Sequence, residues 1–192
     1  MKVAAVVAEI LKREGVQFLI GYPVNQVLEA AAETDIRTII VRQERTGLHM
    51  ADAVSRVTSG DRIGVFAMQH GPGTENAFGG VAQAFGDSVP IVVLPGGYPR
   101  RLLNIPPNFS SFLNYQHVTK WAEQAILPET IPDVMRRAFT PAAPNAKYMT
   151  PPSPFTVSLA DNIARLGLNV EQHLPLHGRL VPMAELAKAI GK

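Results

Sequence analysis

The chain has 192 residues, of which 46% are hydrophobic and 18% charged, and its formal net charge is +2. This length allows one well-packed core with an appendage, and the composition is that of an ordinary soluble protein. The absence of cysteine excludes disulfides and thiolate chemistry. The basic residues form no long run, and no apolar run approaches a membrane span, so we expect neither a nucleic-acid nor a membrane partner. Because the N-terminus is unlike a secretory signal, we expect a cytoplasmic location.

Helical and strand-like segments alternate from the start of the chain. Residues 3–11 carry an apolar stripe at helical spacing, and residues 16–20 follow as a short apolar strand. Asn25 is placed to cap a second helix, because its side chain can accept from the first backbone amides. Residues 36–41 are rich in β-branched side chains and predict a buried second strand.

The same alternation continues through the next two strands. Residues 63–68 and residues 91–94 are short and apolar, and an Ala- and Gly-rich helix that ends at Phe85 separates them. Helices that alternate with apolar strands indicate an α/β fold with a doubly wound parallel sheet flanked by helices.

Beyond the fourth strand the pattern becomes less regular. Residues 95–97 are expected to end that strand, and residues 102–114 to form an irregular segment. Residues 118–127 predict a further strand at the edge of the sheet, and residues 128–139 predict a helix with one apolar face.

The composition changes at residue 140. Five of the 16 prolines lie between residues 141 and 154, which is typical of a linker. We therefore expect three parts, the last of them a short tail that contains α-helix: a domain at 1–139, a Pro-rich linker at 140–154 and a C-terminal tail at 155–192.

Glu44 lies where the second strand gives way to a helix. In a parallel α/β sheet, ligands bind in the crevice outside the carboxyl ends of the strands, so this carboxylate is a candidate functional group. A carboxyl that transfers protons needs apolar, water-poor surroundings, which neighbours such as Leu48 would provide. Arg42 and Arg45 would act against this unless they point outward. The alternative is an ordinary first-turn acid that the helix dipole favours.

The residues around Glu44 carry a family resemblance. The stretch from Arg42 to Arg56 resembles the Arg-x-Glu-x-x-x-x-x-Met-Ala-Asp-x-x-x-Arg segment of thiamine-diphosphate enzymes of the acetolactate synthase and pyruvate oxidase type. Further matches occur in family order over about residues 1–139: Gly21-Tyr22-Pro23, Gly71-Pro72-Gly73, Asp87-Ser88-Val89-Pro90 and Thr119-Lys120-Trp121. The resemblance implies the pyrimidine-binding domain of such an enzyme. It also implies a lyase or transferase (an acetolactate synthase or a 2-keto acid decarboxylase) that uses thiamine diphosphate, acts on a 2-keto acid and forms a homo-oligomer such as a dimer.

The resemblance also implies roles for individual residues. Glu44 would hydrogen-bond the pyrimidine ring nitrogen and favour the imino tautomer, whose exocyclic nitrogen takes the C2 proton of the cofactor. His70 stands where the family has a small polar residue and is a candidate proton shuttle, with a solvent-facing or core histidine as the alternative. The expected cofactor-binding residues are Tyr22, Pro23, Glu44, Gly71, Pro72, Gly73 and Asn76. The glycine turn among them also fits a plain strand-to-helix loop.

Other family features do not occur in this sequence. The Gly-Asp-Gly segment and downstream asparagine pair that hold the diphosphate and Mg²⁺ have no counterpart, so no metal site is expected on this chain. We expect a partner domain or chain to bind the diphosphate and Mg²⁺, and the isolated chain to be inactive. Val24 and Gly97 replace a Gly and a Gln of the family, which favours a second interpretation, a non-catalytic dimerisation or interaction module.

Residues 151–192 resemble a different family, the C-terminus of metallo-β-lactamase-fold hydrolases. The resemblance rests on Asp161-Asn162-Ile163 and on Leu174-Pro175-Leu176-His177-Gly178-Arg179. In that family the histidine of this loop, here His177, is a metal ligand. His173 lies four residues earlier, but the intervening Pro175 argues against a shared helix face, and one imidazole does not make a zinc site. A metallo-hydrolase remnant is therefore the third and weakest interpretation.

Overall fold

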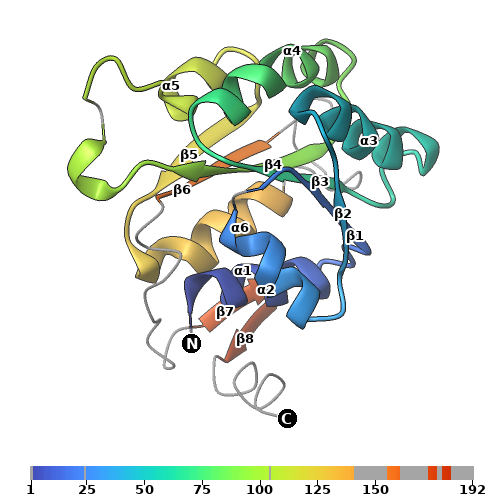
Figure 1. The fold of residues 1–192 in the computed structure, drawn as a ribbon. Helices are drawn as coiled ribbons and strands as arrows, with labels where there is room; N and C mark the ends of the chain where they lie inside the picture. The colour runs from blue at the N-terminus through green and yellow to red at the C-terminus, as the bar shows by residue number, and fades with distance from the viewer. Residues whose placement is uncertain are drawn as a thin grey trace.

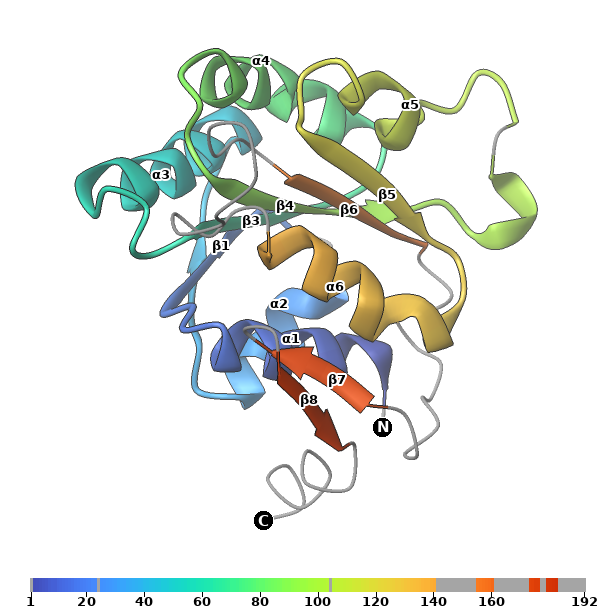
Figure 2. The same cartoon turned by 180° about the vertical axis from the view of Figure 1, so that it is seen from behind.

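The computed structural model describes the backbone and side chains of residues 2–23, 25–103 and 105–140, and the backbone of three strands at 155–160, 173–176 and 179–182. A layer of helices covers each face of a central sheet (Figures 1 and 2). No helix in the described ranges is long and apolar enough to cross a membrane.

The central sheet has six strands in the order β2-β1-β3-β4-β6-β5, and every neighbouring pair is parallel. The strands are β1 (Phe18–Gly21), β2 (Arg37–Ile40), β3 (Gly64–Met68), β4 (Ile91–Gly97), β5 (Trp121–Ala125) and β6 (Phe155–Ala160). This order confirms the predicted doubly wound parallel sheet. Because β2 and β3 lie on opposite sides of β1, the chain reverses direction across the sheet there, and such a switch point is a common ligand site.

Two sets of helices bury two separate apolar clusters against the sheet. One face carries α1 (Val3–Arg13), α2 (Gln26–Glu33) and α6 (Ile131–Phe139), the last preceded by a 3-10 turn at Pro128–Thr130. The other face carries α3 (Glu44–Val57), α4 (Pro72–Gly86) and α5 (Ser111–Tyr115). In β3, Val65 and Ala67 join the first cluster, whereas Phe66 and Met68 join the second. Burial on both faces explains why the central strands are continuous apolar runs.

The second strand is less buried than its sequence predicts. β2 lies at one edge of the sheet and pairs only with β1 among the described strands. Arg37 is exposed and the Ile40 side chain is 57% exposed. The prediction of a buried strand was therefore wrong, because β-branched composition does not reveal which strand takes the edge.

The segment after the fourth strand is also more regular than expected. β4 continues through Gly97 instead of ending before residue 95, and a 3-10 turn follows at Arg100–Leu102. The helix α5 forms within the segment that was expected to be irregular. Ser110 caps it, because its Oγ accepts a hydrogen bond from the Leu113 backbone N–H at 3.3 Å.

A strand from the C-terminal part of the chain completes the sheet. β6 pairs with β4 on one side and with β5 on the other, so that Phe155 has both Val92 and Trp121 as register partners. β5 takes the edge position that its sequence predicts and reaches the sheet through β6. β7 (His173–Leu176) and β8 (Arg179–Pro182) form a separate antiparallel pair. The predicted linker and any helix of the tail lie outside the described residues.

α3 lies directly on the neighbouring strand. At Gly64, a Cβ atom would stand 1.9 Å from the carbonyl oxygen of Ala51 in α3, so only glycine allows this approach. The buried Ser55 fixes the same contact: its Oγ donates to the Pro90 carbonyl at 2.5 Å and accepts from the Gly64 N–H at 2.8 Å. The middle and the C-terminal part of α3, the helix that begins at Glu44, are thereby anchored to the sheet.

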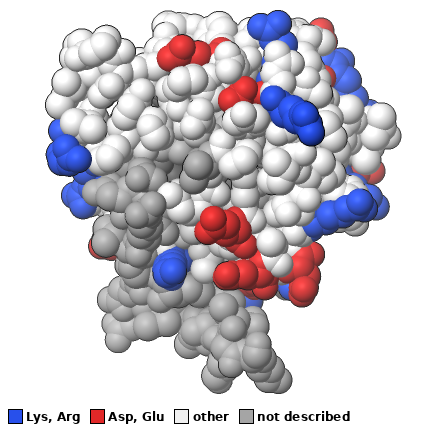
Figure 3. All heavy atoms as spheres, viewed as in Figure 1, with Lys and Arg blue, Asp and Glu red and all other residues white. Residues whose placement is uncertain are grey.

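Charged side chains pair locally on the surface. On the face in Figure 3, basic side chains are scattered and do not form a continuous field. Arg56 of α3 donates to Asp52 at 2.8 Å and to Asp87, just after α4, at 2.6 Å. These hydrogen bonds, the one to Asp52 first, raise the pKa of the Arg56 guanidinium. Arg56 thus joins the C-terminal ends of α3 and α4, and Asp52 of the same stretch holds the Arg56 side chain.

Candidate functional site

One buried asparagine at the switch point connects the segment that follows β1 with the end of β3 and the middle of β4. Asn25, only 6% exposed, follows β1 and caps α2 by accepting from the Val27 N–H at 3.0 Å. Its Nδ2 group also donates to the carbonyls of Met68, at 2.9 Å, and Leu94, at 3.0 Å. The sequence predicted the cap but not the two bonds to β3 and β4, because nothing local indicates partners more than 40 residues away.

Glu44 is the first residue of α3 and is 5% exposed. The Nδ2 group of Asn76, on α4, donates to its Oε2 at 3.1 Å, while Oε1 has no hydrogen-bond partner among the described residues. Arg42 and Arg45 are exposed, and neither pairs with Glu44. The structure therefore joins two of the predicted site residues and leaves one carboxylate oxygen free to bond a ligand.

The glycine turn before α4 has a fixed conformation. Gly71 has a φ of +62°, which favours glycine, and Pro72 occupies the first turn of the helix. Thr74 Oγ1 donates to the Gly71 carbonyl at 2.7 Å, and the buried Tyr115 hydroxyl donates to the Thr74 carbonyl at 2.6 Å. Burial raises the pKa of the Tyr115 phenol. The turn is thus held both by its own helix and by α5.

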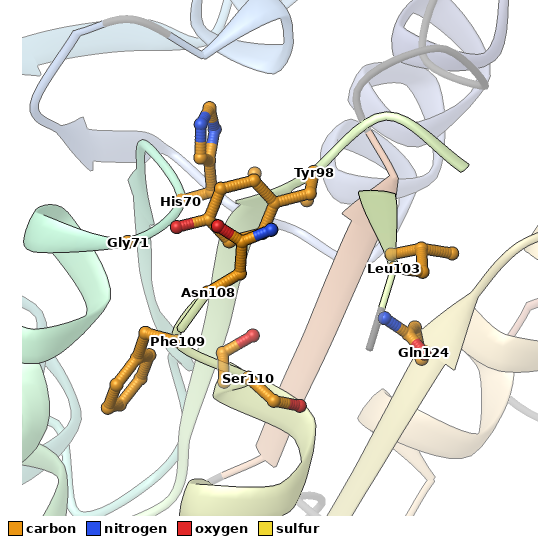
Figure 4. A pocket seen from close by; sticks show the side chains of 11 residues that line it. His70, Gly71, Tyr98, Leu103, Asn108, Phe109, Ser110 and Gln124 are labelled. Atoms are coloured by element: carbon orange, nitrogen blue, oxygen red, sulfur yellow. The ribbon is translucent and has the colours of Figure 1, made fainter. Parts of the chain in front are cut away.

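His70 lies at the end of β3, just before the glycine turn. Its ring contacts the ring of Tyr98, with 4.4 Å between the centroids and 59° between the planes. The two rings line a small cavity of about 20 Å³, seen in Figure 4. His70 thus faces a tyrosine that the sequence did not indicate, whereas Glu44 bonds Asn76. The catalytic role predicted for His70 remains a prediction.

The first two predicted cofactor residues follow β1. The Tyr22 N–H donates to the Ala67 carbonyl at 3.0 Å, which extends the pairing of β1 and β3. Pro23 lines a separate groove of about 290 Å³ between α2 and β2, together with side chains such as Leu28 and Ile40. Neither residue hydrogen-bonds Glu44. Val24 lies outside the described residues.

The expectation that this chain has no metal site stays a prediction. In the part of the chain that the structure describes, no three His, Asp or Glu side chains lie together as metal ligands. The backbone of His173 lies in β7, and His177 falls outside the described residues.

Comparison with known proteins identifies the fold family. The family model for the N-terminal TPP-binding domain of thiamine pyrophosphate enzymes matches residues 1–126. The chain is 30% identical over 178 residues to a probable acetolactate synthase large subunit of Methanocaldococcus jannaschii, and 33% identical over 182 residues to the acetolactate synthase isozyme 3 large subunit of Escherichia coli. Both alignments cover 90% of this chain and 29% of the relative. A third relative, from Parasynechococcus marenigrum, is 39% identical over 104 residues, which is 50% of this chain and 16% of that protein.

These alignments also bear on the C-terminal tail. A coverage of 90% leaves about a tenth of the chain unaligned, which is fewer residues than 151–192 contains. The similarity to acetolactate synthases therefore continues into the tail, and the comparisons give no support to the resemblance to metallo-β-lactamase-fold hydrolases. With the parallel sheet and the family match over residues 1–126, the chain belongs to the family of N-terminal TPP-binding domains of thiamine pyrophosphate enzymes.

Proposed function

We propose that the chain is the pyrimidine-binding half of a thiamine-diphosphate enzyme that acts on 2-keto acids, in an acetolactate synthase-like or decarboxylase-like reaction. The observation that carries this proposal is the buried Glu44, with one oxygen held by Asn76 and the other free of described partners. The relatives that are named acetolactate synthases support the substrate class. We also propose a homo-oligomer in the cytoplasm.

The arrangement around Glu44 suits the pyrimidine ring of the cofactor. Thiamine diphosphate supplies a carbon, C2 of its thiazolium ring, that becomes nucleophilic after it loses a proton. Glu44 Oε1 would share a proton with the pyrimidine ring nitrogen, while Asn76 fixes the carboxyl through Oε2. Because Glu44 is almost fully buried, few water molecules compete for this bond.

The remaining cofactor contacts are assigned to neighbouring loops. Tyr22 and Pro23, and the turn of Gly71, Pro72 and Gly73, would contact the cofactor, because both loops follow strands that flank the switch point. The diphosphate and Mg²⁺ are assigned to a partner domain or chain, since the chain spans 29% of its acetolactate synthase relatives. Residues 1–139 are proposed as the pyrimidine domain, 140–154 as a linker and 155–192 as a tail whose strand β6 joins the sheet of that domain.

The proposal is tested by complementation. We expect the purified chain to show no turnover of pyruvate with thiamine diphosphate and Mg²⁺ until a diphosphate-binding partner is added. Robust turnover by the chain alone would show that no partner is needed.

The role of Glu44 is tested by the substitution Glu44→Gln in the complemented enzyme. The amide keeps the shape but cannot share a proton, so exchange of the cofactor C2 proton, followed by NMR, should slow about 100-fold or more. Glu75→Gln is the matched control, because Glu75 is also a first-turn acid but is exposed. If Glu44 is only a helix-start residue, both variants will exchange at the wild-type rate and lose at most about 1 kcal/mol of stability.

Two exposed apolar side chains favour the second candidate function, a non-catalytic dimerisation module. Val57 at the end of α3 is 82% exposed and Phe85 near the end of α4 is 39% exposed. The ion pair of Arg56 with Asp87 keeps these two helix ends together. Sedimentation tests this candidate: a monomer at micromolar concentration excludes it, and a dimer that Val57→Asp dissociates supports it.

A further inference from the structure

The cavity beside His70 lies at the same edge of the sheet as Glu44 but under different elements. It is bounded by the loop after β3, the end of β4, the loop that precedes α5, and one residue of β5 (Figure 4). Its described lining residues are His70, Gly71, Gly96, Gly97, Tyr98, Leu103, Asn108, Phe109, Ser110, Ser111 and Gln124.

The described lining mixes polar groups with the apolar side chains of Leu103 and Phe109 and carries no fixed charge. Hydroxyl groups come from Tyr98 and Ser110, an amide from Gln124, and the imidazole from the ring described above. No Asp, Glu, Lys or Arg is among the described lining residues. Such a surface orients a ligand by hydrogen bonds and does not require an ionic partner on the ligand. It suits a carbonyl, hydroxyl or short alkyl group.

The Tyr98 side chain limits the size of this cavity. In Figure 4 it occupies the middle of the pocket. The remaining volume of about 20 Å³ admits one water-sized group. The ring contacts His70, and a Cβ atom on Gly71 would stand 2.8 Å from the Tyr98 hydroxyl. The absence of a side chain at position 71 therefore makes room for this tyrosine.

The helix α4 connects the cavity to the proposed cofactor site. Gly71 lines the cavity, and Asn76, which bonds Glu44, is five residues further along α4. Five residues of α-helix rise by about 7.5 Å. A ligand group in the cavity would thus be within the length of a small molecule from the cofactor.

We propose that Tyr98 is a specificity-determining residue, which restricts this pocket to the small end of the substrate. This inference rests on the proposed function, because the substrate is a 2-keto acid and the end in question is the group attached to its keto carbon. With the phenol in place, the pocket admits a methyl-sized group and excludes a branched one. One additional methylene against a close-fitting wall changes affinity by roughly 10- to 200-fold.

The test follows the backbone amides of Gly71, Gly96 and Gly97 by NMR in the full chain. Pyruvate and its branched analogue 3-methyl-2-oxobutanoate are titrated separately at millimolar concentration. In the wild type we expect pyruvate to shift these amides and the branched acid to bind about tenfold more weakly. Tyr98→Leu should reduce this difference to about threefold or less, whereas Tyr98→Phe, which keeps the ring, should retain it.

Leu113→Ala is the control, because Leu113 is on α5, is 53% exposed and does not line the cavity. It should behave as the wild type does. The proposal is overturned if neither acid shifts the pocket glycines in the wild type, or if Tyr98→Leu leaves the size preference unchanged. The amide spectrum of each variant reports whether it is folded, and Tyr98→Val, which also lacks the ring, replaces Tyr98→Leu if that variant does not fold.

These outcomes are separable from a failure of the proposed function, since the titration needs no cofactor. A size preference that depends on Tyr98, together with C2 exchange that Glu44→Gln leaves unchanged, would retain the pocket and reject the cofactor role. Slowed exchange with no size preference would retain the cofactor role and reject Tyr98 as a specificity determinant.

Discussion

At the scale of single residues, Asn25 makes more hydrogen bonds than its predicted role as a helix cap indicates. One buried side chain makes three hydrogen bonds and thereby connects the start of α2 with the end of β3 and the middle of β4. Asn25→Ala should remove a helix cap and leave the Met68 and Leu94 carbonyls without these partners, at a cost of about 2–4 kcal/mol. Urea unfolding measures this loss.

Asn114→Ala is the matched control for this prediction. Asn114 is exposed, and the hydrogen-bond partner of its Nδ2 group among the described residues is the carbonyl of Ser110, the N-cap of its own helix, at 2.8 Å. Its replacement should change the free energy of unfolding by about 0.5 kcal/mol or less. Equal losses in the two variants would mean that the bonds of Asn25 to β3 and β4 do not stabilise the fold.

Ionisation of the Tyr115 phenol should lower the stability of the folded chain at alkaline pH. Burial raises the pKa of its phenol above the ordinary value of 10, so the native state binds the proton more tightly than the unfolded chain does. The stabilisation is complete below pH 10 and falls as the pH rises from there toward the folded pKa. Tyr115→Phe should be less stable than the wild type at pH 8, by about 1–3 kcal/mol, because the Thr74 carbonyl loses its donor.

The difference between the two proteins should narrow above pH 10, since only the wild type has this phenol to ionise. Melting temperatures of both proteins between pH 8 and pH 11 check the prediction. A difference that stays constant over this range would show that Tyr115 does not contribute to the pH dependence.

The sequence predicted part of the candidate site at this scale. Glu44 and Asn76 were both expected to contact the cofactor, and the structure joins them by a hydrogen bond. The contact of His70 with Tyr98 could not be foreseen, because it joins loops after two different strands. The direction of a side chain at a strand end depends on what packs around the loop, and the local spacing of residues does not encode this.

At the scale of secondary structure, the closeness of α3 to β3 depends on glycine. Gly64→Ala would place a methyl group against the backbone of Ala51, where no side chain can move aside, so we expect a loss of several kcal/mol. At Gly86, the last residue of α4, a Cβ atom would have nothing within 4 Å, so Gly86→Ala should be neutral or stabilising by up to about 1 kcal/mol. Thermal unfolding of the pair is the measurement, and a similar loss in both would contradict the packing argument.

The elements that were predicted well are those whose pattern is local. Apolar stripes located the helices α1, α3 and α6, an Ala- and Gly-rich composition located α4, and the short apolar runs located β1, β3 and β4, to within a few residues. The exposed face of β2 was missed, since edge position depends on strand order. α5 was missed because five residues are too few for a helical period to show.

At the scale of the whole molecule, the sheet depends on residues far along the chain. A chain that stops after Thr140 would keep β5 but lose β6, which is the only described strand that pairs with β5. We expect this truncation to lower the melting temperature or abolish cooperative unfolding, whereas a chain that stops after residue 172 should stay closer to the full chain. Circular dichroism melts of both forms test this, and identical melts would show that β6 does not stabilise the sheet.

The position of β6 has a consequence for how the protein is made. During translation, the ribosome releases β4 and β5 before β6, although β6 lies between them in the sheet. Until β6 emerges, β4 has an open edge that can pair with another nascent chain, and unpaired edges of this kind promote aggregation. The yield of soluble protein should therefore fall when synthesis is slowed between residues 140 and 155, and rise when chaperones protect the growing chain at that stage.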